Sequence, residues 1–216
     1  MNHTPTKLLP DPHTPARPIR ATLQLAALLA ALAAPGALPA QGTPTATPEA
    51  MIALPALDVP GYMGTWYQVA WFPNRFQRQC VSDTRAEYQQ LPDGRIRVLN
   101  RCRLADGKMD KADGIARPAG SVLEGTQLKP AQLEVSFLPA WLRWVPAWGS
   151  YWVIARANDG RYAVVSEPQR EYLWVLAREP RLSADDEATI RSQLAKQGFD
   201  LARWQAHPHT AEAPRR

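Results

Sequence analysis

Between Gly64 and Arg178, hydrophobic and polar residues alternate in short runs that Gly, Pro, Asp or Asn close. Alternation with a period of two is typical of β-strands that bury one face. The predicted strands span residues 64–72, 82–90, 95–103, 109–117, 132–138, 150–157, 161–166 and 171–178. Turn signals such as Pro92-Asp93-Gly94 favour tight connections between antiparallel neighbours. We therefore expect an all-β fold, an eight-stranded antiparallel up-and-down barrel, because closure removes the edge strands.

The first predicted strand has two apolar faces. Its alternation places one set on one face, Trp66, Gln68, Ala70 and Phe72, and a second set on the other, Tyr67, Val69 and Trp71. Both faces therefore need to be covered. The barrel interior on one side and a helix on the other would cover them.

That helix is predicted for residues 183–197. Ser183 with Asp186 three residues later favours a capped N-terminus, and Gly198 ends the segment. Ile190 and Leu194 share a narrow apolar stripe, which indicates packing against the outside of the barrel. Residues 200–204 could add a short ninth strand.

The N-terminal part has the pattern of an export signal. Residues 21–34 are apolar, basic residues precede them, and Leu38-Pro39-Ala40 suits cleavage by signal peptidase. A membrane anchor is the alternative, but about 14 apolar residues are short for a bilayer. We expect a signal peptide over 1–40, a flexible linker over 41–60, one domain over 61–206 and a disordered tail over 207–216.

The charge of the chain gives little support to nucleic-acid binding. The formal net charge is +5, and removal of residues 1–40 leaves 22 basic and 19 acidic residues without a dense basic run. We expect no nucleic-acid partner. The mild positive charge would suit transient contact with an anionic membrane surface.

Cys80 and Cys102 are the two cysteines of the chain. In an exported protein they are expected to form a disulfide. A simple turn at Asp93-Gly94 would set Cys102 opposite residue 84 or 85, so pairing requires the loop over 73–81 to fold back. The alternative, Cys80 as a nucleophile, would need a histidine nearby, and His207 and His209 lie in the C-terminal tail.

Five motifs in order carry a resemblance to a known family. They are Gly64-Thr65-Trp66-Tyr67, Val98-Leu99-Asn100, Leu133-Glu134-Val135-Ser136-Phe137, Tyr172-Leu173-Trp174-Val175-Leu176 and Arg178. With eight strands followed by a helix, the chain resembles the lipocalins over about residues 61–204, and within them the branch of bacterial lipocalins and apolipoprotein D.

The resemblance implies a structural role for three residues. Trp66 would close one end of the barrel, Arg178 would pack across it, and Gly64 would open the first strand. Arg170-Glu171-Tyr172 replaces the Thr-Asp-Tyr of many lipocalins. Bacterial lipocalins are often acylated on an N-terminal cysteine, and no cysteine precedes Cys80 here. We therefore expect a periplasmic or secreted protein, with association with the outer membrane left open.

The implied function is binding and transport or storage of a hydrophobic small molecule, such as a fatty acid or lysophospholipid, in the bacterial cell envelope. Alternation and resemblance together give the expected ligand-binding residues: Ala70, Phe72, Tyr88, Val98, Asn100, Phe137, Trp141, Tyr151, Val153 and Trp174. An alternative is that these side chains fill the barrel completely.

No catalytic grouping, metal-ligand spacing or phosphate-binding loop is found in the sequence, so we expect no enzyme, cofactor or metal. A lipid-modifying enzyme that uses Cys80 and a non-transporting envelope scaffold remain alternatives. The sequence does not indicate an oligomeric state.

Residues 139–149 hold Trp141, Trp144 and Trp148 between prolines. The rings could pack on the barrel, or they could form an aromatic lip at its mouth, where indoles suit a membrane interface. In the second reading Arg75, Arg78 and Arg143 would meet an anionic head group.

Overall fold

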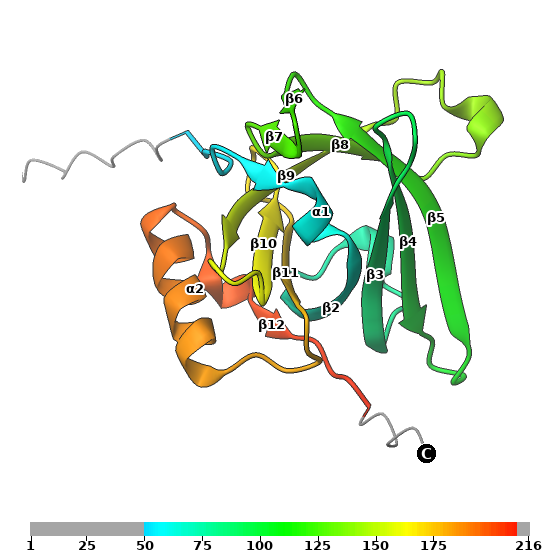
Figure 1. Cartoon of the computed structure of the whole chain (residues 1–216). Coiled ribbons are helices and arrows are strands. Elements are labelled where there is room, and N and C mark those ends of the chain that lie inside the picture. Colours follow the sequence, from blue (N-terminus) through cyan, green and yellow to red (C-terminus); the bar gives the residue numbers. More distant parts are fainter. Residues whose placement is uncertain (1–49, 211–216) are drawn as a thin grey trace, which may run out of the picture. The chain divides into compact units, whose positions relative to one another are not determined.

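Eight antiparallel strands close into a barrel in the computed structural model, which describes residues 50–210 of the chain (Figure 1). Each strand pairs with the next along the chain, and β11 pairs with β2 to complete the closure. The strands are β2 (Gly64–Trp71), β3 (Ser82–Gln90), β4 (Ile96–Arg103), β5 (Met109–Pro118), β8 (Gln132–Ser136), β9 (Gly149–Arg156), β10 (Tyr162–Ser166) and β11 (Leu173–Ala177). The predicted up-and-down barrel is confirmed.

The folded domain begins earlier than the sequence pattern predicts. Strand β1 (Leu57–Asp58) and helix α1 (Val59–Tyr62) lie within or next to the segment expected to be a linker, and Met51 and Ala53 are already buried. The linker assignment is therefore wrong for residues 51–60. These short apolar pieces lie between prolines, and they gain order from backbone bonds such as that from the Leu54 amide to the Val153 carbonyl, at 2.8 Å. The predicted signal peptide and residues 41–49 lie outside the described residues.

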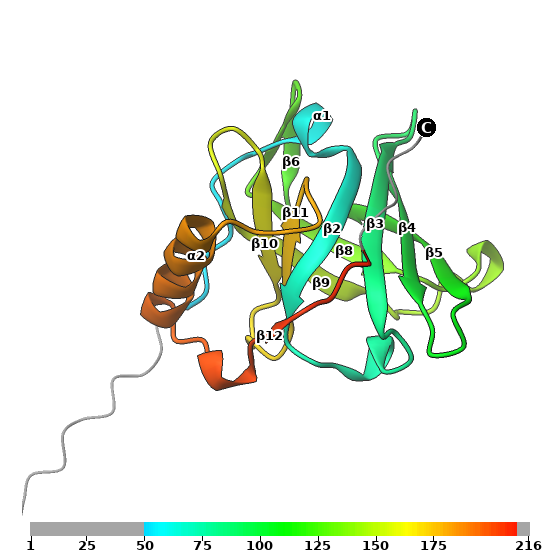
Figure 2. The ribbon, with the colours of Figure 1, turned by 90° about the horizontal axis from the view of Figure 1, so that it is seen from below.

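A second small sheet lies beside the barrel. Strands β6 (Val122–Glu124) and β7 (Gln127–Lys129) form a hairpin in a segment expected to be a loop, and β1 pairs with β7. The hairpin and α1 stand at the same end of the barrel (Figure 2). We call this the closed end.

Helix α2 (Ala184–Lys196) packs on the outer wall, as predicted (Figure 2). The Asp186 amide donates to Ser183 Oγ at 3.1 Å, which caps the first turn. Ile190 and Leu194 are buried in the outer core cluster together with Phe72, Val164 and Val175.

Strand β2 changes its inward face near Val69 and Ala70. Gln68 pairs with Leu176, which belongs to the inner cluster, but Ala70 pairs with Val175 of the outer cluster. The register shifts by one residue between these pairs, so regular alternation ends there. Ala70 and Phe72 therefore face the helix, and their assignment to the barrel lining is wrong.

The C-terminal segment fills a gap in the barrel wall. Strands β2 and β3 pair only over Gly64–Tyr67, and β12 (Gln205–Ala206) then takes the free edge of β2. Residues 200–204 form a cap and the turn η3 (Leu201–Arg203), so the short ninth strand follows the predicted position. The His207 amide donates to the Val69 carbonyl at 2.9 Å, and the Asp83 amide donates to the Pro208 carbonyl at 3.0 Å. The disordered-tail assignment is wrong for residues 207–210.

Cys80 and Cys102 form the predicted disulfide, with their Cα atoms 5.4 Å apart. A bulge in β3 makes the pairing possible. Arg85 pairs with Arg101 but Ser82 pairs with Arg103, and Asp83 between them has a positive φ of 56°. The loop from β2 to β3 includes the turn η1 (Arg75–Gln77), after which Cys80 comes back toward the end of β4.

Candidate functional site

The closed end of the barrel is plugged by α1 and the first residues of β2. The Arg178 guanidinium lies 3.7 Å from the centroid of the fully buried Trp66 ring. Arg178 also donates to the carbonyls of Gly61, Met63 and Thr65, at 2.8–2.9 Å. The Trp66 indole donates to the Tyr62 carbonyl at 2.8 Å. These contacts fix α1 across the barrel end, which agrees with the structural role that Trp66 and Arg178 were expected to have.

Gly64 adopts a positive φ of 91°, a region that side chains with Cβ rarely occupy. It begins β2 directly after the plug. The conformation turns the chain from α1 into the strand, which explains why glycine stands here.

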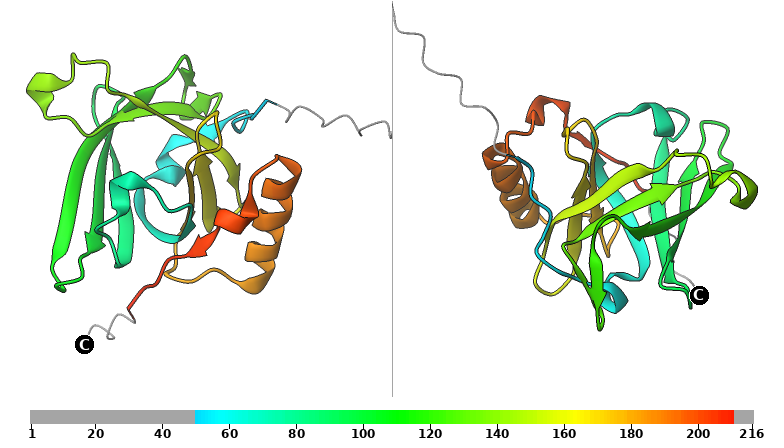
Figure 3. Two further views of the ribbon diagram at one scale, coloured as in Figure 1. Left: turned by 180° about the vertical axis from the view of Figure 1, so that it is seen from behind. Right: turned by 90° about the horizontal axis from the view of Figure 1, so that it is seen from above.

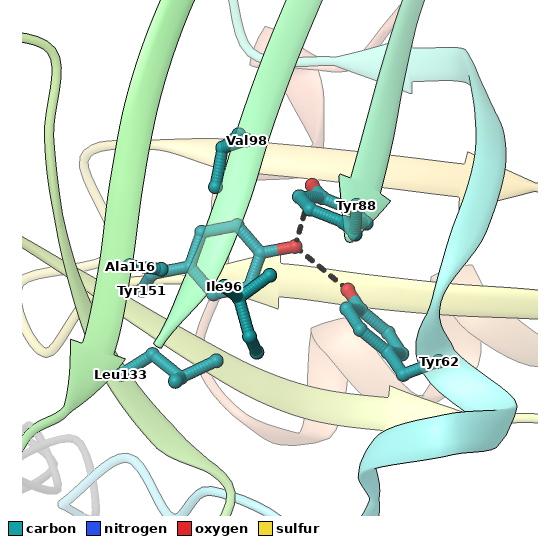
Figure 4. Close-up of a pocket in the computed structure, with 7 residues that line it drawn as sticks. All are labelled: Tyr62, Tyr88, Ile96, Val98, Ala116, Leu133 and Tyr151. Atoms are coloured by element: carbon teal, nitrogen blue, oxygen red, sulfur yellow. Dashed lines mark hydrogen bonds between the residues drawn. The ribbon is translucent and has the colours of Figure 1, made fainter. Parts of the chain in front are cut away.

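Three tyrosines form a layer just above the plug (Figure 4). The Tyr151 hydroxyl lies 2.7 Å from the Tyr62 hydroxyl and 2.9 Å from the Tyr88 hydroxyl. Burial raises the pKa of Tyr88 to about 12, and burial also raises the pKa values of Tyr62 and Tyr151. The three phenols are therefore neutral at physiological pH. Three hydroxyl hydrogens serve two oxygen-to-oxygen contacts, so one hydrogen remains to be donated to another acceptor.

The space around this layer is small. A cavity of about 10 Å³ lies here, and its lining residues are Tyr62, Tyr88, Ile96, Val98, Ala116, Leu133 and Tyr151. That volume is about what one water molecule needs. The closed half of the barrel is therefore filled by its own side chains.

The opposite half of the barrel is more open. Phe137 follows the last residue of β8. Its ring packs over Gly114 of β5, so closely that a Cβ added to Gly114 would lie 2.7 Å from the ring. Phe137 is nevertheless 42% exposed. Trp174 and Asn100 lie on inward faces and are only partly buried. These aromatic and amide groups remain partly accessible to solvent at the end of the barrel opposite the plug, which we call the mouth.

Gln77 of η1 reaches into this mouth and joins two strands. Its Nε2 donates to Gln68 Oε1 at 2.8 Å, and its Oε1 accepts from the Trp174 indole at 2.8 Å. Because Gln68 comes from β2 and Trp174 from β11, the loop over 73–81 is held against the two strands whose pairing closes the barrel.

The structure divides the ten expected ligand-binding residues into four groups. Tyr88, Val98, Tyr151 and Val153 belong to the filled half, and Asn100, Phe137 and Trp174 line the open half. Ala70 and Phe72 lie outside the barrel wall, and Trp141 lies in an exposed loop. Strand alternation does not predict Tyr62, Gln77 or His207, because each comes from a turn or a terminal segment. Trp71 was missed because the β2 bulge turns it inward.

The loop between β8 and β9 contains the turn η2 (Ala140–Leu142) and holds two highly exposed indoles. Trp141 is 73% exposed and Trp144 is 80% exposed. Trp148 differs, because the Arg117 guanidinium lies 3.9 Å from its ring centroid and the ring is partly buried. The loop, in yellow-green, stands at the side of the barrel, apart from η1, in Figures 1, 2 and 3.

Among residues 50–210, no three His, Cys, Asp or Glu side chains are grouped so that they could hold a metal ion. In the same range, no helix has the length and apolar character needed to cross a bilayer.

An eight-stranded barrel that is plugged at one end and keeps partly exposed aromatic rings on its inner wall at the other resembles the architecture of proteins that bind small hydrophobic molecules. Comparison with known proteins assigns the chain to one such family. Residues 57–209 match the family described as "Lipocalin-like domain". The chain belongs to the lipocalin family.

Its relatives come from plants, bacteria and animals. The chain is 34% identical to temperature-induced lipocalin-1 of Arabidopsis thaliana over 73% of this chain and 82% of that protein. It is 32% identical to outer membrane lipoprotein Blc of Escherichia coli over 84% and 96%. Apolipoprotein D of Mus musculus is 29% identical over 67% and 72%. The resemblance drawn from the motifs is confirmed.

Solved structures support the fold. Insecticyanin from the tobacco hornworm Manduca sexta superimposes with a TM-score of 0.55 at 16% identity, over 74% of this chain and 84% of that one. The cockroach allergen Per a 4 gives a TM-score of 0.54 at 15% identity, over 73% and 92%.

Proposed function

We propose that this lipocalin binds and carries, or stores, a fatty acid, lysophospholipid or similar lipid in the open half of its barrel. The observation that carries the proposal is the inward-facing Phe137, which stays 42% exposed, together with the inward-facing Trp174, which is only partly buried. An exposed aromatic ring on an inner wall gains free energy when an acyl chain covers it. The filled tyrosine layer would limit how deep that chain enters.

We further propose that the protein acts in the bacterial cell envelope, in the periplasm or as a secreted protein. Two observations support this location. Residues 1–40 have the pattern of an export signal, and the relatives named Blc are described as outer membrane lipoproteins.

The exposed indoles suit loading from a membrane surface. Trp141 and Trp144 present two apolar rings to solvent, and Arg143 between them donates to the Leu138 carbonyl at 3.1 Å. Indoles favour the boundary between head groups and acyl chains, and arginine binds phosphate or carboxylate. Arg75 and Arg78 of the loop over 73–81 are also exposed and would add positive charge at the mouth.

Binding is tested by titrating the exported protein with lysophospholipids and fatty acids while its tryptophan fluorescence is recorded. We expect a saturable change with at least one acyl chain length. A signal that does not saturate with any of them would show that the barrel is filled throughout, and would favour the envelope-scaffold alternative.

Loading is tested by the double variant Trp141→Ala with Trp144→Ala. We expect slower ligand uptake from anionic vesicles and nearly unchanged thermal stability, because both rings are exposed. Val122→Ala with Leu123→Ala is the matched control, since these residues are 61% and 40% exposed at the closed end. If the tryptophan variant melts several degrees lower and takes up ligand normally, its rings serve packing.

The enzyme alternative depended on a free Cys80 thiol. In the structure this sulfur is bonded to Cys102, so the proposed nucleophile is absent in the oxidised protein. Intact-mass measurement of the non-reduced exported protein tests this point. We expect the disulfide mass and no alkylation, whereas an alkylated Cys80 would restore the alternative.

A further inference from the structure

The C-terminal segment completes the barrel wall between β2 and β3. Beyond the Tyr67–Arg85 pair the two strands separate, and His207 and Pro208 bond to the backbone of Val69 and Asp83 instead. The His209 ring bonds to the Gln68 carbonyl at 2.9 Å. This stretch of wall, which we call the seam, is thus made of β2, β3 and residues 205–210.

Three buried polar atoms at the seam lack a hydrogen-bond partner: Gln68 Nε2, Thr84 Oγ1 and His207 Nε2. Their residues are 2%, 4% and 6% exposed. An unpaired buried polar atom costs free energy, and three at one place are unusual for a folded wall.

Thr84 and Gln68 face the barrel interior, and the His207 ring packs beside an inward ring. Thr84 shares a strand face with Ala86 and Tyr88, which belong to the inner cluster. Gln68 bonds to Gln77 inside the mouth. The His207 ring lies 5.6 Å, centroid to centroid, from Trp71, whose strand partner is the inward Trp174. Backbone pairing places all three at the same level of the seam.

The charge at the seam is close to zero. Burial, with a smaller contribution from the neighbouring His209, lowers the pKa of His207 to about 4, so its ring is neutral at physiological pH. Asp83 is the carboxylate nearby, and its oxygens already accept from Arg103, Thr210 and Ser82. An anionic head group buried here would lack a partner of opposite charge.

The available atoms therefore suit a neutral group that both donates and accepts. Gln68 Nε2 offers N–H donors, and Thr84 Oγ1 can donate or accept. His207 Nε2 takes either role according to the tautomer. A hydroxyl group satisfies this set without a charge.

We propose that the seam is a binding subsite for a hydroxyl group of the lipid ligand, so that the barrel prefers hydroxyl-bearing lipids such as monoacylglycerols over the corresponding esters without hydroxyls. The proposal rests on the proposed lipid-binding function. It adds the polar group that the ligand carries and the residues that recognise it.

The test compares 1-monolauroylglycerol with methyl laurate, which has the same acyl chain and no hydroxyl. We expect the wild type to bind the monoacylglycerol about three- to tenfold more tightly, the effect of one or two net hydrogen bonds. Thr84→Val should abolish this preference and leave methyl laurate binding unchanged. Because the substitution removes an unpaired hydroxyl and keeps the shape, it should fold normally.

Two further variants sharpen the result. Thr84→Ser keeps the hydroxyl and should keep the preference, and Thr65→Val, at an exposed position of β2, should have no effect. Equal affinities of the wild type for both lipids, or a preference that survives in Thr84→Val, would overturn the seam subsite and leave the lipid-binding function standing. If neither lipid binds the wild type, both proposals fail.

Discussion

The two halves of this barrel differ in how completely their side chains are packed and hydrogen-bonded. At the closed end, Trp66 is fully buried, Arg178 covers its ring, and the hydroxyls of three tyrosines bond to one another. At the open end, Phe137 remains exposed and polar atoms of the seam lack partners. Sites that break the rules of packing and hydrogen bonding are where function is expected, since they do not serve stability. The closed half therefore maintains the fold, and the open half provides the binding surface.

The largest effect should follow a change in the plug. Trp66→Ala removes a fully buried ring and the partner of Arg178, so we expect it to lower the free energy of unfolding by about 3–5 kcal/mol. Urea unfolding measures the loss. Trp144→Ala, at an 80% exposed position, is the matched control and should change stability by less than about 0.5 kcal/mol. Similar losses in both variants would contradict the division into halves.

The tyrosine layer should depend on its central member. Tyr151→Phe leaves the hydroxyls of Tyr62 and Tyr88 both without their partner, at a cost of about 2–4 kcal/mol. Tyr88→Phe leaves Tyr151 bonded to Tyr62 and should cost about half as much. Thermal and urea unfolding of the two variants compare them. A larger loss for Tyr88→Phe would refute the central role of Tyr151.

The open half should respond to crowding near Phe137. In Gly114→Ala the new Cβ would lie 2.7 Å from the Phe137 ring and 2.9 Å from the Ser136 carbonyl oxygen, so both the ring and the backbone before it must move, at a cost of about 1–3 kcal/mol in stability. We expect lipid affinity to fall as well. Gly149→Ala is the control, because its nearest neighbour would be the Val135 carbonyl oxygen at 3.9 Å. Unchanged binding in Gly114→Ala would remove Phe137 from the site.

The seam should give a smaller, pH-dependent effect. Folding lowers the pKa of His207 from 6.5 to about 4, so between these values the unfolded chain binds more protons than the folded chain. The contribution of His207 to stability should be constant above about pH 6.5 and fall progressively as the pH drops toward 4.

His207→Gln should reduce the dependence of stability on pH between about 6.5 and 4, as measured by urea unfolding at each pH. The pKa of Asp83 is lowered from 3.8 to about 2, so its contribution is lost only below that window. A wild-type slope that persists in His207→Gln would assign the pH dependence to another group.

The sequence predicts the barrel because one-sided strands repeat the same period eight times. Turn residues, the capped helix at Ser183 and the Gly64–Trp66 start are local signals, and all appear in the structure. The disulfide was predictable from the expected export to an oxidising compartment. The register of β3 and β4 did not predict it, since the bulge at Asp83 has no sequence signature.

The binding site was only partly predictable. A one-residue slip near Ala70 reversed the faces of β2 and moved Ala70 and Phe72 out of the lining. His207 joins the wall through long-range backbone bonds, and Tyr62 enters from a four-residue helix. Tertiary contacts place these residues, so alternation along the chain does not reveal them.

The most direct test of where the ligand sits is quenching of tryptophan fluorescence by a fatty acid that carries bromine on its acyl chain. Trp174 faces the open half, whereas Trp204 lies outside the barrel beside Arg191 of α2. We expect saturable quenching of the wild type, a smaller quenched fraction in Trp174→Phe, and wild-type quenching of the remaining signal in Trp204→Phe. Saturable quenching that is unaffected by Trp174→Phe, or none at all, would contradict binding in the open half.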